Sequence, residues 1–198
     1  MARPRPATLA HRLHHADLKL LQRSHRRRSA ALDRGLVGIT EAANYSRLWL
    51  TIAAALAAFG GPRGRRASVS GVLAVGIAAS ATNGPVKLAF RRRRPPSHPR
   101  PPLIPMPKST SFPSGHSAAA FAFATGASAR LPYLGPVLFP LAGAVAYSRV
   151  HVGVHFPSDV LIGSGLGLAA GLAAARMVGG QEPPAAAAIA PTAPVSPA

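Results

Sequence analysis

Residues 68–90 read SVSGVLAVGIAASATNGPVKLAF, and Lys87 is the one charged residue in this stretch. A helix needs about 20 predominantly apolar residues to cross the hydrocarbon core of a bilayer, so the stretch is long enough to span it. Residues 159–178 form a second stretch of similar length, with charges only at Asp159 and Arg176. Both stretches therefore predict membrane-spanning helices.

Three shorter apolar stretches complete the series, at residues 44–61, 115–130 and 134–148. The first is adequate for a span, whereas the other two need their polar flanks to complete one. Small residues let helices pack closely in lipid, and the last stretch carries glycines at Gly163, Gly165, Gly167 and Gly171. The expected fold is an all-α, multi-pass transmembrane helical bundle of about five spans, and a soluble bundle of buried helices is the alternative.

The placement of charge supports the membrane interpretation. Hydrophobic residues make up 48% of the chain and charged residues 14%, yet the net charge is +18. The basic residues gather in residues 1–47, 63–66 and 91–100, between the apolar stretches. This pattern fits loops that meet anionic head groups. No nucleic-acid partner is expected, because residues 1–30 contain no Phe, Trp or Tyr on which a base would stack.

Three segments are expected along the chain. Residues 1–35 form a basic segment, either a helix on the membrane surface or a disordered arm. Residues 36–178 form the membrane-embedded domain, and residues 179–198 form an Ala/Pro-rich tail that is expected to be disordered. No motif indicates an oligomeric state.

The acidic residues are too few for a carboxylate-bound metal centre. Two-metal phosphatases need several oxygen ligands around one site. Only Asp159 lies among the conspicuous polar residues of the apolar region, and the chain has no cysteine. No metal or other cofactor is therefore expected. The five carboxylates of the chain are Asp17, Asp33, Glu41, Asp159 and Glu182.

Polar residues stand at the ends of the second and third apolar stretches. Lys87 and Arg94 are seven residues apart, so they share a helix face if the second helix continues to Pro95. Ser114 directly precedes the third helix, where it can act as the N-cap. The free backbone N–H groups at such a helix start form an anion site.

A second polar group follows the fourth stretch. Arg149 ends the fourth helix, and His155 and Asp159 flank the start of the fifth. With five spans, the loops after the second and fourth helices lie on one side of the membrane, so both polar groups can converge. Such a set suits phosphoryl transfer: cations hold the phosphate oxygens, one histidine attacks phosphorus and another protonates the leaving oxygen. A carboxylate beside the attacking histidine fixes its tautomer.

In chain order, these residues form three motifs: Lys87-x6-Arg94-Pro95, Pro113-Ser114-Gly115-His116 and Ser148-Arg149-x5-His155-x3-Asp159. Together the motifs resemble the three-part signature of the type 2 phosphatidic acid phosphatases. That superfamily also contains bacterial acid phosphatases and vanadium haloperoxidases. The resemblance implies an all-α, metal-independent phosphatase that acts through a phosphohistidine.

The resemblance also implies a role for each residue. His155 would be the nucleophile, with Asp159 as its orienting partner. His116 would protonate the leaving alcohol and then activate the water that releases phosphate. The phosphate would be bound by Lys87, Arg94, Arg149, Ser114 and the backbone amide of Gly115. The other signature residues, Pro95, Pro113 and Ser148, would support these groups.

The predicted function is an integral-membrane lipid phosphatase. Its substrate would be a phosphomonoester or diphosphate of phosphatidate, phosphatidylglycerol phosphate or polyprenyl phosphate type. A vanadate-dependent haloperoxidase-like enzyme and a non-catalytic basic membrane scaffold are the alternatives. The resemblance favours a site on the extracytoplasmic face of the cell membrane. However, 18 of the 23 Lys and Arg residues lie on the predicted active-site side, which by the positive-inside rule favours the cytoplasmic face.

Overall fold

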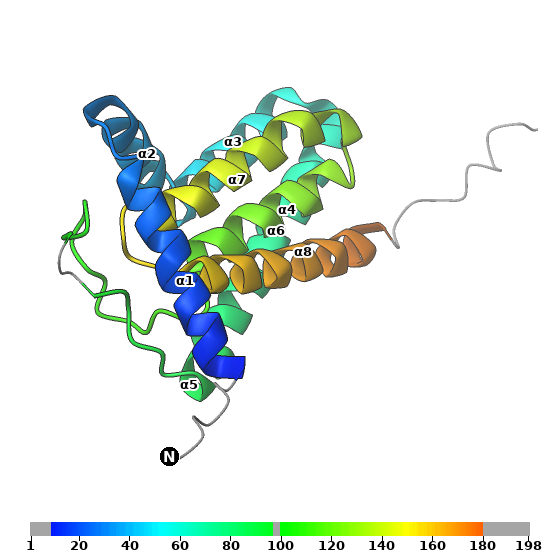
Figure 1. Cartoon of the computed structure of the whole chain (residues 1–198). Coiled ribbons are helices and arrows are strands. Elements are labelled where there is room, and N and C mark those ends of the chain that lie inside the picture. The colour runs from blue at the N-terminus through cyan, green and yellow to red at the C-terminus, as the bar shows by residue number, and fades with distance from the viewer. Residues whose placement is uncertain (1–8, 97–99, 180–198) are drawn as a thin grey trace, which may run out of the picture.

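The computed structural model describes residues 9–96 and 100–179 (Figure 1). Within these ranges the secondary structure is entirely helical and contains no strand, which confirms the all-α prediction. The tail predicted to be disordered, residues 179–198, lies outside the described residues except for Gly179, which is the last residue of α8.

Each of the five apolar stretches corresponds to one helix of the structure. They are α3 (Arg47–Phe59), α4 (Gly61–Ala81), α6 (Gly115–Ser128), α7 (Gly135–His151) and α8 (Pro157–Gly179). Two segments, Gly61–Gly84 and Pro157–Gly179, are long and apolar enough to cross a membrane. These correspond to the two stretches for which full spans are predicted. The other three helices are shorter, so the number of about five spans remains a prediction.

Helix α6 lies at the centre of the bundle, where it packs most extensively against α8 and α4. Its contact with α8 depends on small residues. A Cβ atom at Gly167 would overlap the carbonyl oxygen of Ala118, and one at Gly171 would overlap Thr125. By contrast, a Cβ at Gly165 would meet nothing within 4 Å. The face of α8 that packs closely against α6 therefore carries Gly167 and Gly171 but not Gly165.

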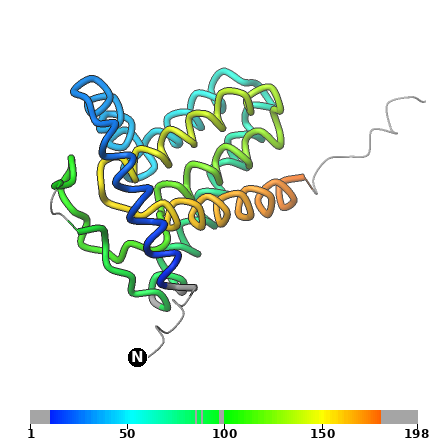
Figure 2. The backbone as a smooth tube through the Cα atoms, viewed as in Figure 1, coloured from blue at the N-terminus to red at the C-terminus, as the bar shows by residue number. Residues whose placement is uncertain are grey.

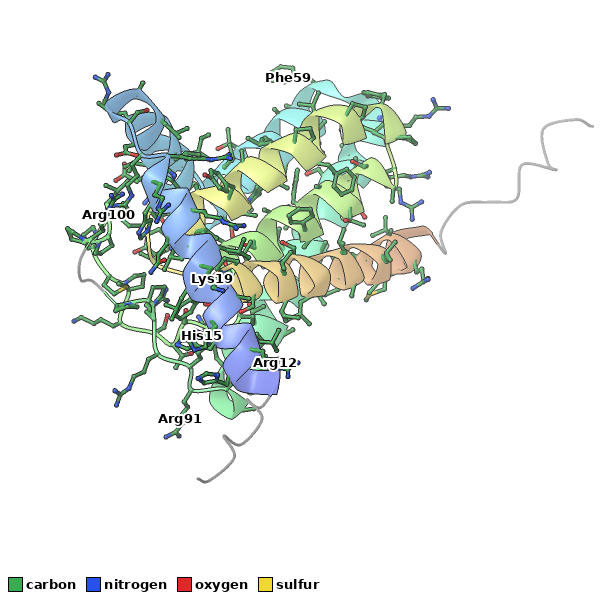
Figure 3. All side chains as sticks on the ribbon, in the orientation of Figure 1. Arg12, His15, Lys19, Phe59, Arg91 and Arg100 are labelled. Carbon is green, nitrogen blue, oxygen red and sulfur yellow. The ribbon has the colours of Figure 1, made fainter. Side chains whose placement is uncertain are left out.

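The N-terminal region forms two helices, α1 (Leu9–Arg26) and α2 (Ala30–Ala42). Helix α1 crosses the ends of α7 and α8 (Figure 1) and contacts both. On its inner face, Leu21 joins a buried cluster with Val150 and Phe156. Figure 3 labels Arg12, His15 and Lys19 along α1, and all three side chains are exposed. Residues 9–26 of the basic segment are therefore a docked helix with a basic outer surface.

The second helix does not continue to Pro95, so the condition for a shared helical face of Lys87 and Arg94 is not met. Helix α4 ends at Ala81 and is followed by a π-helical turn, Thr82–Val86, and the short α5 (Lys87–Ala89). Gly84 leaves the helical conformation, with φ −92° and ψ −116°. The next residue is proline, which lacks a backbone N–H and disfavours a helical conformation in the residue before it.

Between α5 and α6, residues 90–96 and 100–114 form a long non-helical segment that runs beside α1 (Figure 2). The backbone N–H of Ser111 donates to the carbonyl of Arg92, and that of Leu103 donates to the carbonyl of Val152. Two 3-10 turns complete the fold: Asn44–Ser46 between α2 and α3, and Pro132–Leu134 before α7. The segment and the Asn44–Ser46 turn both reach the same end of the bundle, where the polar residues gather.

Candidate active site

A cavity of about 250 Å³ lies where α6, α7 and the connections before α3, α6 and α8 meet. Groups from all three sequence motifs line it, as the predicted convergence requires. The residues that it shares with the predicted site are Lys87, Arg94, Gly115, His116, Arg149 and His155.

His155 lies in the short connection between α7 and α8, with 3% of its surface exposed. Its Nδ1 is 3.6 Å from Oδ2 of Asp159, one helical turn further along the chain. Its Nε2 is 3.2 Å from a guanidinium nitrogen of Arg94. With the proton on Nδ1, directed at the carboxylate, the lone pair of Nε2 is directed toward the arginine. This is the tautomer that a nucleophilic imidazole needs.

Burial lowers the pKa of His155 to about 4. The positive charges of Arg149 and Arg94 act in the same direction, whereas the neighbouring Asp159 opposes them. A histidine with this pKa is uncharged at neutral pH, so the Nε2 lone pair is available.

Arg94 and Lys87 meet although no helix joins them. Arg94 donates to the backbone carbonyls of Ser109 (2.9 Å) and Val154 (2.7 Å). The side-chain oxygen of Ser109 accepts from Arg94 at 3.1 Å and from Lys87 at 3.5 Å. Lys87 also donates to Oδ1 of Asn83 at 3.2 Å. The long segment before α6 therefore brings the two cations together, rather than a shared helical face.

Two further site residues, Arg149 and His116, are held by Thr40 in α2 and by Asn44 in the 3-10 turn that follows α2, contacts that were not predicted. Arg149, which is 2% exposed, donates to Oγ1 of Thr40 at 2.5 Å. Nε2 of His116 lies 2.9 Å from Oδ1 of Asn44. The residue after Asn44, Tyr45, adopts a left-handed backbone conformation with φ 53°, which is uncommon for a residue other than glycine. No local motif in the sequence indicates these long-range pairs.

The second motif forms the start of α6. Ser114 is buried and acts as the N-cap: its side-chain oxygen accepts from the backbone N–H of Ser117 at 3.4 Å and from its hydroxyl at 2.9 Å. Gly115, rather than Ser114, lines the cavity. The remaining signature residues, Pro95, Pro113 and Ser148, are buried and do not line the cavity.

Apart from His155, the partners of Asp159 were not predicted. Oδ2 of this fully buried carboxylate accepts from the Ser111 hydroxyl at 2.5 Å and from the backbone N–H of Phe156 at 2.9 Å. Oδ1 accepts from Arg92 at 2.7 Å. Arg92 belongs to a run of four arginines, so composition alone does not distinguish it from its neighbours.

The arrangement is suited to phosphoryl transfer. Lys87, Arg94 and Arg149 concentrate positive charge at one cavity, which favours a phosphate group and the charge that develops as it is transferred. An uncharged imidazole backed by a carboxylate supplies a nucleophile, and a second imidazole lies in the same cavity.

Comparison with known proteins agrees with this chemistry. The chain is 39% identical over 100 residues to decaprenylphosphoryl-5-phosphoribose phosphatase of Mycobacterium tuberculosis, in each of two strains. The alignment covers 49% of this chain and 54% of the relative, so it spans about half the length of these curated relatives.

Two crystal structures have similar folds. The transmembrane PAP2 type phosphatidylglycerolphosphate phosphatase of Bacillus subtilis has a TM-score of 0.69 and 27% identity, over 88% of this chain and 89% of that one. LpxE of Aquifex aeolicus has a TM-score of 0.61 and 25% identity, over 80% and 94%. A family model matches residues 68–182, which include all three motifs. The chain therefore belongs to the PAP2 superfamily.

Proposed function

We propose that the chain is an integral-membrane lipid phosphatase that hydrolyses a phosphomonoester or diphosphate of a lipid through a phosphohistidine, without a metal. The observation that carries the proposal is the position of the His155 ring at the cation-lined cavity, with Nδ1 3.6 Å from the Asp159 carboxylate and Nε2 3.2 Å from Arg94. The names of the relatives add support for the substrate class, since they refer to phosphatases of decaprenylphosphoryl-5-phosphoribose and phosphatidylglycerolphosphate.

The reaction then has two steps. In the first, the lone pair of His155 Nε2 forms a bond to phosphorus as the bond to the lipid oxygen breaks, and His116 gives that oxygen a proton. In the second, water attacks the phosphohistidine, His116 accepts a proton from it, and the nitrogen–phosphorus bond breaks to release phosphate. Lys87, Arg94 and Arg149 bind the phosphoryl oxygens in both steps, with the backbone amide of Gly115 at the start of α6.

The direct test is phosphate release by detergent-purified protein in excess EDTA. The substrates are phosphatidate, phosphatidylglycerol phosphate, a polyprenyl phosphate, a polyprenyl diphosphate and a polyprenyl-phosphoryl-5-phosphoribose. We expect release that EDTA does not reduce and that vanadate inhibits. Folded protein that releases phosphate from none of these lipids would contradict the proposal. Halide oxidation on adding vanadate and peroxide would instead support the haloperoxidase alternative.

The pH dependence of kcat/KM follows from the lowered pKa of His155, about 4 in the free protein. Protonation removes the Nε2 lone pair, so activity should be present at neutral pH and fall as the pH drops through about 4. The measurement is kcat/KM from pH 3 to 8, with folding checked by circular dichroism at each pH. An acid limb near 6.5, the ordinary pKa of histidine, would show that burial does not lower the pKa of His155.

The contact between Asn44 and His116 predicts an effect that depends on the leaving group. If Asn44 orients His116 as the general acid, Asn44→Ala should lower kcat/KM for an alkyl phosphate about 10- to 100-fold, the usual range for removing an orienting partner. The p-nitrophenolate group of an aryl phosphate such as p-nitrophenyl phosphate leaves without needing a proton. The kcat/KM for this substrate should therefore change little. His116→Ala provides the reference pattern. Equal losses on both substrates would contradict this role for Asn44.

We further propose that the active site faces the extracytoplasmic side of a multi-pass protein in the cell membrane. Helix α8 begins beside the site and runs away from it to Gly179 (Figure 1). Gly179 therefore lies at the opposite end of the bundle from the site. A reporter fused to the C-terminus should therefore be cytoplasmic. A reporter on the outside would instead favour a cytoplasmic active site, as the distribution of Lys and Arg suggests.

A further inference from the structure

Asp17 is a buried carboxylate far from the family motifs in sequence. It lies on the inner face of α1, outside the region matched by the family model, and is 4% exposed. Its Oδ1 accepts from the backbone N–H of Ser158 at 2.9 Å. Its Oδ2 accepts from the hydroxyl of Ser158 at 2.6 Å and from Arg92 at 2.7 Å. A buried charge is costly unless it is paired, and Asp17 is paired to residues beside the active site.

Arg92 bridges Asp17 and Asp159. One guanidinium nitrogen donates to Oδ2 of Asp17, and the other donates to Oδ1 of Asp159, each at 2.7 Å. The guanidinium carbon lies 4.2 Å from the centre of the Phe156 ring, which supports its plane from one side. The side chain is therefore fixed by two carboxylates and an aromatic face.

The bridge holds one of the two oxygens of the Asp159 carboxylate. Arg92 binds Oδ1, so Oδ2 is the oxygen that remains directed at Nδ1 of His155, 3.6 Å away. Ser111 and the backbone N–H of Phe156 hold Oδ2 from the other side. The orientation of the nucleophilic ring thus depends on a chain of contacts that begins on α1.

We propose that Asp17 and Arg92 are positioning residues, which act through Asp159 to orient His155 and to set the charge beside it. This inference rests on the proposed function of His155 as the nucleophile. It makes α1 part of the catalytic machinery, although α1 contributes no side chain to the cavity lining.

The purely structural alternative is that Asp17 only docks α1 onto α8. The two roles differ in their effect on His155, whose proton affinity responds to charge near Asp159. The charged or titratable groups around His155 are Arg94 from the long segment, Arg149 from α7, His116 from α6 and Asp159 from α8. Arg92 neutralises part of the charge of Asp159. Its removal should therefore raise the pKa of His155, whereas a loss of docking alone would lower stability and leave that pKa unchanged.

The experiment compares wild type with Arg92→Gln, Arg92→Lys and Asp17→Asn. Arg92→Gln should lower kcat about 10- to 100-fold, as expected for a partner of a catalytic group, and should move the acid limb of kcat/KM to higher pH. Arg92→Lys keeps the charge but cannot bind both carboxylates, so it should restore the acid limb without restoring kcat. Asp17→Asn keeps one oxygen that can still accept from the backbone N–H of Ser158, and it removes the negative charge that pairs with Arg92. It should lower kcat with a smaller loss of thermal stability than Asp17→Ala.

Lys19→Gln, an exposed change on the same helix, is the matched control and should leave activity and the acid limb unchanged. A double variant, Asp17→Asn with Arg92→Gln, should be no slower than Arg92→Gln alone, because both changes break the same bridge. If the two losses of kcat add up in the double variant and the acid limb of kcat/KM does not move, the proposal is overturned and Asp17 only docks α1.

A titration of the His155 ring by NMR, with isotope-labelled histidine in detergent micelles, gives a readout that needs no turnover. A higher midpoint in Arg92→Gln than in wild type supports the proposal, and equal midpoints overturn it. If wild type hydrolyses no lipid phosphate, the proposed function fails, while this titration still decides whether Arg92 controls the charge of His155.

Discussion

Replacing His155 with alanine is expected to lower kcat/KM for lipid phosphate hydrolysis by at least about four orders of magnitude, the scale seen when a covalent nucleophile is removed. Without Nε2, no protein group accepts the phosphoryl group, and water must attack the lipid phosphate directly. Lys87, Arg94 and Arg149 remain, so the variant should still bind the phosphate. The measurement is phosphate release by purified His155→Ala and wild type at matched concentrations, with binding measured separately.

The covalent intermediate provides a second readout of the same prediction. A nitrogen–phosphorus bond is labile in acid and stable in base, so label from a ³²P-aryl phosphate should remain on wild-type protein after an alkaline quench. His116→Ala should accumulate more label, because it lacks the group that activates water, and His155→Ala should carry none. His15→Ala removes an exposed histidine on α1 (Figure 3) and serves as the control. Label on His155→Ala, or full activity of that variant, would rule out His155 as the nucleophile.

Replacing Gly167 with leucine is expected to prevent stable folding in detergent. A Cβ atom at this position overlaps the carbonyl oxygen of Ala118 and lies 3.0 Å from the backbone nitrogen of Ala122, so α8 cannot keep its contact with α6. Backbone atoms cannot move aside as a flexible side chain can. The smaller change Gly167→Ala should still cost about 1–3 kcal/mol, the usual range for overpacking, and should lower the Tm by several degrees.

Gly165 offers the matched control two residues away on the same helix. A Cβ there meets nothing within 4 Å, and leucine is a better helix former than glycine. Gly165→Leu and Gly165→Ala should therefore keep or raise the wild-type Tm. Thermal unfolding of all four variants in one detergent tests the contrast. Equal Tm values for the two alanine variants would mean that α6 and α8 do not pack as described.

Much of the candidate site can be predicted from the sequence because the information is local. Each motif lies at the end of an apolar stretch, and chain direction alone brings the ends of alternate spans to one side of a bundle. The cap at Ser114 and the one-turn spacing of His155 and Asp159 are likewise read within a few residues. The break at Gly84 also has a local signal, since the sequence Asn-Gly-Pro begins at residue 83, although the sequence analysis extended the helix through it.

The sequence by itself determined the all-helical class, the two long apolar segments, the cations and histidines at the cavity, and the carboxylate beside His155. Only the tertiary structure decided which residues hold them: Thr40 on Arg149, Asn44 on His116, and Asp17 with Arg92 on Asp159. The reason is physical. Helices and caps follow from interactions within a few residues. By contrast, the partners of Asp159, His116 and Arg149 lie 67 to 109 positions away from them in sequence, and Asp17 contacts Ser158 across 141 positions. These contacts form only once the helices have packed.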